Sequence, residues 1–354
     1  MNKLLLESMT RHNATDGQLA QLIRLENSVG MSIILMDIGA TWLSCELMIN
    51  DEPREVLLGI KTLEQFYQQS CYMGATIGRF ANRIHKGEFE LDGIRYKTTT
   101  NQAGNTLHGG ETGFDLCRWH LKESSASHVI FDLVSEEGDQ GFPGRLSVSV
   151  KYQLTEANQV IISYEAKTNK PTPVNLTNHA YFNLLGAESG NDCKGHLVQI
   201  DSDNFLPVDS VGIPLNKPCS VEGTGFDFRT TKRIEADFLR DQQQKPSKGY
   251  DHSYLLNPGV TNLQNIAAKV VSPDERLSLK LYTNKPALQL YTGNWLSGTP
   301  SRSGTCYDDY AGLALETQFL PDSPNHPEWR QPDCILRPGD TYKYTTVYEF
   351  DVHH

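Results

Sequence analysis

The stretch from Val174 to Leu184, V-N-L-T-N-H-A-Y-F-N-L, places a histidine and a tyrosine two positions apart. With the two-residue period of a β-strand, one face is apolar and holds Val174, Leu176, Ala180, Phe182 and Leu184. The opposite face is polar and holds Asn175, Thr177, His179, Tyr181 and Asn183. Neighbours on one face of a strand lie roughly 6 to 7 Å apart, so His179 and Tyr181 are expected side by side over a cleft. The alternative is a core histidine bonded to a carbonyl beside a packing tyrosine.

Two further strands repeat this design. In G-L-A-L-E-T-Q-F, Gly312 to Phe319, alternation sets Glu316 among apolar neighbours, where a carboxylate is poorly solvated and its pKa should rise. No Lys or Arg is close in sequence to pair with it, although the fold could supply one. In A-L-Q-L-Y-T-G-N-W, Ala287 to Trp295, Gln289 shares the polar face with Tyr291. Together these faces predict a concave pocket of the kind that binds sugars. Its candidate walls are Tyr181, Tyr291 and Trp295, for each of which core packing is the alternative.

Three loops add polar candidates. A glycine-punctuated segment after Gly74 delivers Asn82 and Arg83, and the guanidinium fork suits the vicinal hydroxyls of a sugar, although such an arginine is often only a surface charge. His108 precedes two glycines in N-T-L-H-G-G, which permits close approach of backbone or ligand, or marks a simple turn. Asp251 opens a strand after a polar loop.

The remaining elements are predicted to be strands and turns. Met31 to Ile49 indicates two buried strands that break at Gly39, and Asp92-Gly93 predicts a type I′ turn. Alternation over 146–154 and 160–166 predicts an antiparallel hairpin, and alternating tyrosines from Tyr342 predict a closing strand. Glu64 to Ser70 is predicted to form a single helical turn. No sustained helical period or internal repeat is present, so we expect an all-β sandwich.

Composition narrows the classes of function. The 354 residues carry a net charge of -11 with scattered cations, which disfavours nucleic-acid binding. The seven cysteines are odd in number and lack a C-x-x-C pair, which predicts reduced thiols in a cytoplasmic protein. Glu7 interrupts the apolar start, and no run reaches the ~20 residues of a membrane span, so neither a signal peptide nor a membrane segment is expected. Length alone suggests two domains, but we favour a single domain that spans residues 1–354.

Six ordered motifs make the chain similar to the galactose mutarotase (aldose 1-epimerase) family from about Gly17 to Phe350. They are G-R-F-A-N-R-I with the L-D-G hairpin, N-T-L-H-G-G, V-N-L-T-N-H-A-Y-F-N-L, Y-D-H, L-Q-L-Y-T-G-N-W-L, and L-E-T-Q-F-L-P-D-S-P-N-H-P-E-W with a terminal L-R-P-G. The resemblance implies a large antiparallel β-sandwich of the galactose mutarotase-like supersandwich type. It also implies Glu316 as general base and His179 as general acid, with the sugar held by Asn82, Arg83, His108, Asp251 and Gln289. Small departures at Ala180, Tyr250 and Trp295 bear on substrate preference.

The implied reaction interconverts the α and β anomers of a free aldose such as D-galactose or D-glucose. One base and one acid suffice, so no metal and no other cofactor is expected, and the partner is a small sugar bound by a monomer or homodimer. We expect a bell-shaped pH profile with an acid limb from Glu316 and a basic limb from His179.

Other readings remain open at this stage. A glycoside hydrolase would use Asp251 and Glu316 as its carboxylates. A metal site would combine His108, His179, Asp251 and Glu316. A non-catalytic sugar-binding module and a hexose-phosphate epimerase, which would need several cations at one pocket, are further alternatives.

Overall fold

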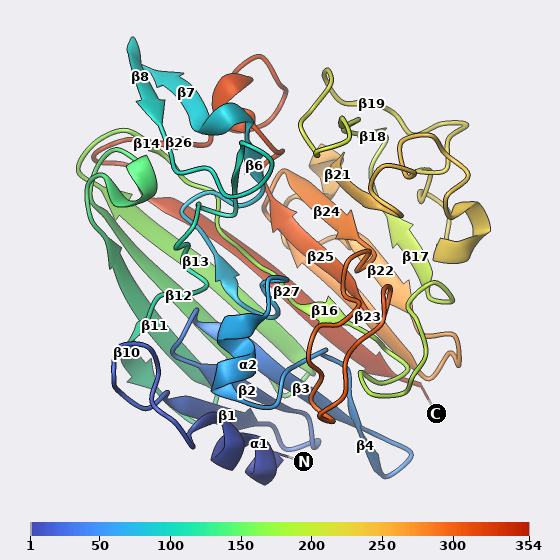
Figure 1. Ribbon diagram of the computed structural model, residues 1–354. Coiled ribbons are helices and arrows are strands. Elements are labelled where there is room, and N and C mark those ends of the chain that lie inside the picture. Colours follow the sequence, from blue (N-terminus) through green and yellow to red (C-terminus); the bar gives the residue numbers. More distant parts are fainter. Residues whose placement is uncertain (1, 354) are drawn as a thin grey trace.

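Strands form nearly all of the regular structure in the computed structural model, which describes residues 2–353 (Figure 1). The largest sheet has nine strands, in the order β10 (His120–Ser124), β11 (His128–Ser135), β12 (Leu146–Leu154), β13 (Gln159–Thr168), β27 (Tyr342–Val352), β23 (Leu277–Thr283), β22 (Ala268–Val271), β17 (Leu197–Ile200) and β20 (Lys232–Arg233). A six-stranded sheet runs in the order β16 (Tyr181–Phe182), β25 (Leu313–Gln318), β24 (Ala287–Tyr291), β21 (Asp251–Leu255), β18 (Asn204–Phe205) and β19 (Cys219–Ser220).

Smaller sheets complete the structure. A four-stranded sheet contains β1 (Leu22–Glu26), β2 (Ser32–Met36), β3 (Thr41–Ile49) and β4 (Glu52–Glu55). Four strand pairs are β14 (Thr172–Pro173) with β26 (Ile335–Leu336), β15 (Thr177–Asn178) with β5 (Thr76–Ile77), β6 (Arg83–Ile84) with β9 (Thr106–Leu107), and β7 (Glu88–Leu91) with β8 (Ile94–Lys97). The strands named in these sheets pair antiparallel.

The six-stranded and nine-stranded sheets pack face to face, the smaller in front of the larger in Figure 1. Between them the hydroxyl of Tyr348 in β27 donates to the carbonyl of Leu315 in β25 at 3.0 Å. The rings of Phe182 and Tyr348 also meet, with centroids 5.4 Å apart. Both rings belong to the largest apolar core cluster, which also includes Trp42 of β3. The expected all-β sandwich is confirmed.

Local patterns predicted several elements correctly. The hairpin of β12 and β13 pairs without a break from Leu146 opposite Thr168 to Leu154 opposite Val160. The turn between β7 and β8 places Asp92 at φ 52° and Gly93 at φ 78°, the positive angles that a type I′ turn requires. The predicted break at Gly39 lies between β2 and β3.

The stretch from Val174 to Leu184 is not one continuous strand, which corrects the sequence-based expectation. It divides into short segments because each pairs with a different partner: Asn175 forms an isolated bridge with Phe80, β15 pairs with β5, and β16 pairs with β25. Its predicted apolar face is nevertheless correct, since all five side chains assigned to it belong to the core cluster.

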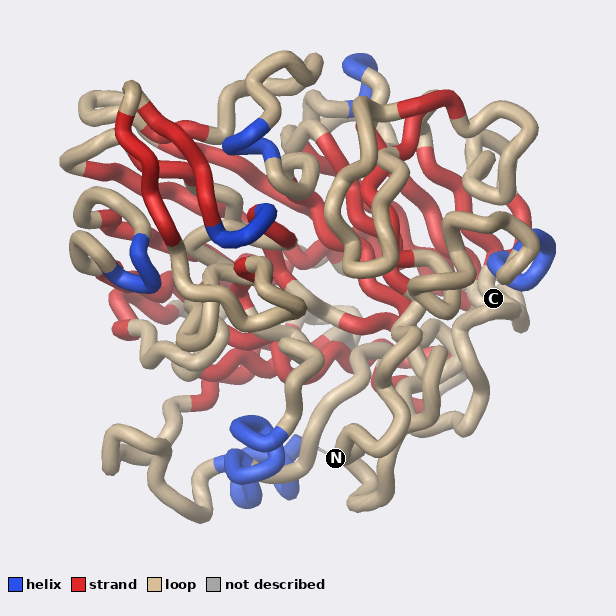
Figure 2. Tube along the Cα trace, turned by 45° about the horizontal axis from the view of Figure 1, so that its top comes forward, coloured by secondary structure: helices blue, strands red, loops and turns tan. Residues whose placement is uncertain are grey.

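Helices are short and peripheral (Figure 2). The predicted turn is α2 (Leu63–Gln68), where Thr62 and Gln65 form a capping box. Sequence patterns did not predict α1 (Asn2–Met9), which packs Leu5 and Met9 against a small cluster that includes Ile34. Five single 3-10 turns span His85–Gly87, Asp139–Gly141, Ile234–Asp237, Pro258–Val260 and Ser323–Asn325. Within residues 2–353, none of the helices has the length and apolar character needed to cross a bilayer.

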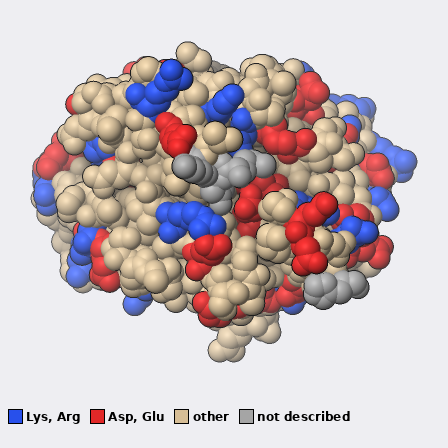
Figure 3. Space-filling view, turned by 90° about the horizontal axis from the view of Figure 1, so that it is seen from below, with Lys and Arg blue, Asp and Glu red and all other residues tan. Residues whose placement is uncertain are grey.

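The structure shows how the charged side chains are distributed and whether the cysteines are paired. On the face seen in Figure 3, basic and acidic side chains are interspersed among residues of other types. All seven cysteines are free thiols. The free thiols agree with the prediction of reduced cysteines.

Candidate active site

A pocket of about 330 Å³ opens where β16, β25 and β21 of the six-stranded sheet meet the loops before β6 and after β9. This volume is near the lower end of the roughly 300 to 1,000 Å³ typical of small-molecule sites. Seven of the eight predicted site residues line it, namely Asn82, Arg83, His108, Tyr181, His179, Asp251 and Glu316. Gln289 is not among the lining residues.

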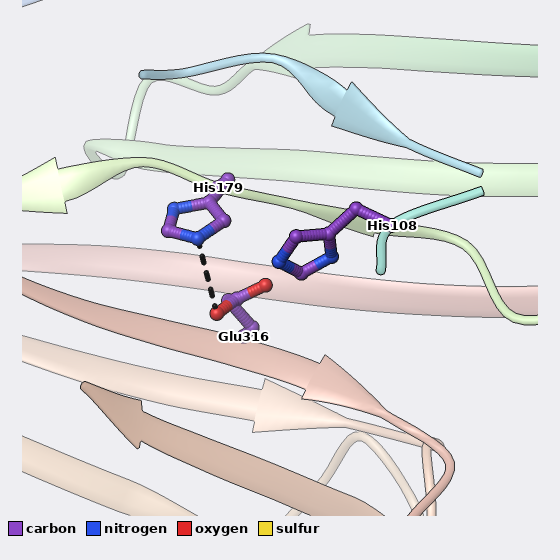
Figure 4. Close-up of side chains that lie close together, drawn as sticks. All are labelled: His108, His179 and Glu316. Atoms are coloured by element: carbon purple, nitrogen blue, oxygen red, sulfur yellow. Dashed lines mark ion pairs between the residues drawn. The ribbon is translucent and has the colours of Figure 1, made fainter. Parts of the chain in front are cut away.

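His179 and Glu316 face each other at the floor of the pocket (Figure 4). Nε2 of His179 lies 3.5 Å from Oε1 of Glu316. Glu316 projects from the middle of β25, whose pairing with β24 fixes its backbone, while His179 lies between the short strands β15 and β16. The rings of His179 and Tyr181 stand side by side with centroids 4.9 Å apart, as their spacing in the sequence predicted.

Burial disfavours the charged form of both groups. The pKa of Glu316 is raised well above its ordinary value, first by burial and then by the negative charge of Asp251, while the charge of Arg83 opposes the shift. Burial lowers the pKa of His179 to about 4. Burial therefore favours the neutral pair, with a shared proton on Glu316, over the ion pair. The second oxygen of that carboxyl, Oε2, is buried and without a hydrogen-bond partner among the described residues.

His108 and Asn82 hold each other through two backbone contacts. The amide N–H of Asn82 donates to Nδ1 of His108 at 3.1 Å, and the amide N–H of His108 donates to the carbonyl of Asn82 at 3.1 Å. Burial lowers the pKa of His108 well below its ordinary value, so the ring is neutral. Because Nδ1 is the acceptor, the proton of the neutral ring must be on Nε2. His108 therefore presents a fixed N–H donor.

This tautomer does not fit a metal site. One potential ligand atom from each of His108, His179 and Glu316 lies within 4.8 Å of the others. A metal needs an unprotonated ring nitrogen, but Nδ1 of His108 already accepts a hydrogen bond and its Nε2 carries the proton. The group is better suited to hydrogen bonding with a polar ligand than to holding a cation.

Arg83 and Asp251 form a second polar pair on the pocket wall. The guanidinium donates to Oε1 of Gln102 at 3.2 Å and to Oδ1 of Asn82 at 3.3 Å, and it lies 3.9 Å from Oδ2 of Asp251. Gly212 packs against it so tightly that a Cβ there would come within 2.5 Å of the guanidinium carbon. The contacts therefore hold the charged fork in place beside the pocket.

Gln289 lies behind Asp251 and is almost fully buried. Its Nε2 donates to Oδ1 of Asp251 at 2.6 Å. The alternation of β24 correctly predicted that the side chain of Gln289 would share a face with Tyr291. The pairing register of β24 with β21 and β25 determines which side chains Gln289 contacts.

Tyr72 is one of five pocket-lining residues that sequence reasoning missed. Its ring packs edge-on against His108, with centroids 4.6 Å apart, and stacks at 6.0 Å from His179. It lies in a loop with φ of 58° and has no periodic neighbours, so no strand pattern marks it. The other four are Ser70, Cys71 and Gln102, which lie outside the named strands, and Leu107, which ends the two-residue strand β9.

Comparison with known proteins identifies the relatives of this chain. The family model for aldose 1-epimerase matches residues 21–349. This chain belongs to the aldose 1-epimerase family. The chain is 50% identical to an aldose 1-epimerase of Escherichia coli (strain K12), over 95% of this chain and 97% of that protein. It is 42% identical to a galactose mutarotase of Bos taurus, over 84% of both chains.

Solved structures of the aldose 1-epimerase family share the fold. A galactose 1-epimerase from Lactobacillus acidophilus NCFM has a TM-score of 0.84 at 30% identity and covers 97% of this chain and 98% of its own. An aldose epimerase homologue from C. elegans has a TM-score of 0.86 at 29% identity and covers 95% of this chain and 100% of its own. The resemblance found in the sequence motifs is thus confirmed across the whole β-sandwich.

Proposed function

We propose that the protein is an aldose 1-epimerase that interconverts the α and β anomers of free hexoses such as D-galactose and D-glucose. The observation that carries this proposal is the opposed pair of His179 and Glu316 at the floor of a pocket sized for one small ligand. Membership of the aldose 1-epimerase family supports the same reaction.

The reaction requires two proton transfers at opposite ends of one hemiacetal. With Glu316 ionised and His179 protonated, Glu316 removes the proton of the anomeric hydroxyl while His179 protonates the ring oxygen, and the bond between C1 and the ring oxygen breaks. The open aldehyde turns about its C1–C2 bond. Ring closure on the other face reverses both transfers, so one shared proton serves the whole turnover. Each positioned transfer contributes roughly 10²- to 10⁴-fold, or about 3 to 5 kcal/mol.

Because burial favours the shared proton on Glu316, this proton must reach His179 before ring opening. The 3.5 Å separation of their facing atoms makes this a short transfer. His108 contributes a fixed N–H donor, which we place near the ring oxygen, where negative charge develops before the proton arrives.

The sugar must be held by groups away from C1, because C1 has to turn. Arg83 and Asp251 offer donors and an acceptor on one wall, and Asn82 borders them. Tyr181, Tyr291 and Trp295 supply aromatic surface, and Trp295, 57% exposed, stands at the rim. Apolar ring faces of hexoses pack against such surfaces while their hydroxyls reach the polar wall.

The rival readings find less support. Among the lining residues, Arg83 is the single Lys or Arg, which disfavours a phosphorylated sugar. The tautomer of His108 disfavours a metal centre. A hydrolase would need two carboxylates acting on a glycosidic bond, whereas the groups in closest opposition here are a carboxyl and an imidazole.

Polarimetry tests the proposal directly. Freshly dissolved α-D-galactose or α-D-glucose changes its optical rotation as the anomers equilibrate. We expect the protein to accelerate this relaxation in proportion to its concentration without altering the final rotation. A relaxation rate unchanged by the protein would reject the proposal.

Three further expectations accompany the function. We propose that 1–354 forms one domain, which the extent of the core cluster from Leu25 to Phe350 supports. We propose a cytoplasmic location, supported by the seven free cysteines. The oligomeric state, monomer or homodimer, stays a prediction.

A further inference from the structure

Three polar side chains behind the pocket form a hydrogen-bonded chain that ends on Asp251. Ser253 of β21 stands directly opposite Gln289 of β24, which in turn stands opposite Glu316 of β25. Gln318 lies two residues beyond Glu316 and therefore on the same face of β25. Ser253, Gln289 and Gln318 are 1%, 2% and 0% exposed, so their hydrogen bonds are made within the protein interior.

The hydrogen bonds in this chain have a single consistent direction. Nε2 of Gln318 donates to the hydroxyl oxygen of Ser253 at 3.2 Å and to Oε1 of Gln289 at 3.3 Å. The hydroxyl of Ser253 donates to the same Oε1 of Gln289. With its oxygen occupied by two donors, Gln289 must direct its amino group toward Asp251, where Nε2 meets Oδ1 at 2.6 Å.

The opposite orientation of the Gln289 amide is unfavourable. It would place the amide oxygen against the Asp251 carboxylate and the amino group against the amino group of Gln318. Both contacts set like partial charges together in a dry region, where an unmatched polar group costs about 1 to 3 kcal/mol. The Asp251 carboxylate therefore selects the amino end of Gln289, and Ser253 and Gln318 hold the opposite end by donating to its oxygen. Oε1 of Gln318 itself has no hydrogen-bond partner among the described residues.

We propose that Ser253 and Gln318 are positioning residues that orient the sugar-binding carboxylate through Gln289. The anchored Gln289 amide holds Oδ1 of Asp251, which leaves Oδ2, on the side of Arg83, to accept a sugar hydroxyl. This inference rests on the proposed function, because it requires Asp251 to bind the substrate. It extends the site to residues that do not line the pocket.

A double-mutant cycle tests the inference in the full-length protein. Ser253→Ala and Gln318→Met each break the chain, and we expect KM for galactose to rise roughly 10-fold with kcat little changed. In the Asp251→Asn background, where the amide no longer offers the same acceptor, we expect Ser253→Ala to leave KM unchanged. This loss of effect identifies a residue that acts through Asp251.

Thr317→Val is the matched control. Thr317 is the neighbour of Gln318 but faces the other sheet, where its hydroxyl bonds to Thr346. Its variant loses a buried hydroxyl of β25 without touching Asp251, so we expect wild-type KM. If Gln318→Met fails to fold, the Ser253→Ala cycle decides alone.

The outcomes are distinguishable from those that test the function itself. A wild-type protein without mutarotase activity rejects the proposed function. Suppose instead that the wild type is active. If Ser253→Ala then raises KM by the same factor in the wild type and in the Asp251→Asn variant, the positioning role is rejected. A fall in kcat with KM unchanged also rejects it.

Discussion

Nε2 of His179 and Oε1 of Glu316 face each other across 3.5 Å in surroundings that disfavour the charge of both. An ordinary ion pair would hold Glu316 ionised and His179 protonated. Burial favours the opposite arrangement, with both groups neutral and the proton on the carboxyl. The reaction passes through both arrangements, because ring opening moves a proton onto Glu316 and ring closure returns it.

The pH profile should reflect the total number of protons that His179 and Glu316 hold together, because the pair titrates as a unit. The pKa of His179 is lowered to about 4, so a second proton joins the pair only near that pH. The pKa of Glu316 is raised, so its proton leaves only well above the ordinary carboxyl range. Activity should therefore decline below about pH 4 and again on the alkaline side.

These shifts assign the limbs of the profile in the opposite order from the sequence-based expectation, with His179 on the acid side and Glu316 on the basic side. Polarimetric kcat/KM values, corrected for spontaneous relaxation, check this. An acid limb near the ordinary imidazole pKa of about 6.5 would show that burial does not lower the pKa of His179.

Replacing Arg83 should weaken sugar binding more than catalysis. Arg83→Met removes donors that the neighbouring Asn82 and Asp251 hold beside the pocket. Loss of a charged hydrogen bond costs about 1.5 to 3 kcal/mol, which corresponds to a KM increase of roughly 10- to 100-fold. Steady-state polarimetry separates KM from kcat. Arg95→Met, on the exposed strand β8, is the matched control and should behave as wild type. A fall confined to kcat would place Arg83 at the reacting atoms instead.

Metal removal should leave activity intact. His108 has its Nδ1 occupied and its proton on Nε2, so the histidines and Glu316 do not form a ligand set. Dialysis against EDTA, followed by polarimetry with and without added Zn²⁺, measures this. A loss of activity that a divalent cation restores would contradict the assigned tautomer.

Sequence periodicity predicted the parts of the site that lie on regular strands. Glu316 on β25 and the side-by-side rings of His179 and Tyr181 were found because alternation separates a dry face from a polar one. Periodicity did not predict that the segment around His179 divides between two partner strands, β5 and β25, because each pairing is non-local.

Loop contacts and cross-strand register were beyond the reach of the sequence. Tyr72 reaches the two histidines from a loop whose path depends on distant contacts. Gln289 was expected around the sugar, and its direct contact with a ligand stays a prediction. The structure shows it bonded to Asp251, a contact set by the register of β21 and β24.

The Glu316→Gln variant gives the most direct measurement of the central claim. The amide keeps the shape of the side chain but cannot accept the anomeric proton, so polarimetry of α-D-galactose should show kcat reduced by roughly 10²-fold or more, while calorimetric titration still shows sugar binding. Glu165→Gln, exposed on β13, serves as control and should retain full activity. If Glu316→Gln relaxes the sugar at the wild-type rate, the carboxyl of Glu316 is not the base and the account fails.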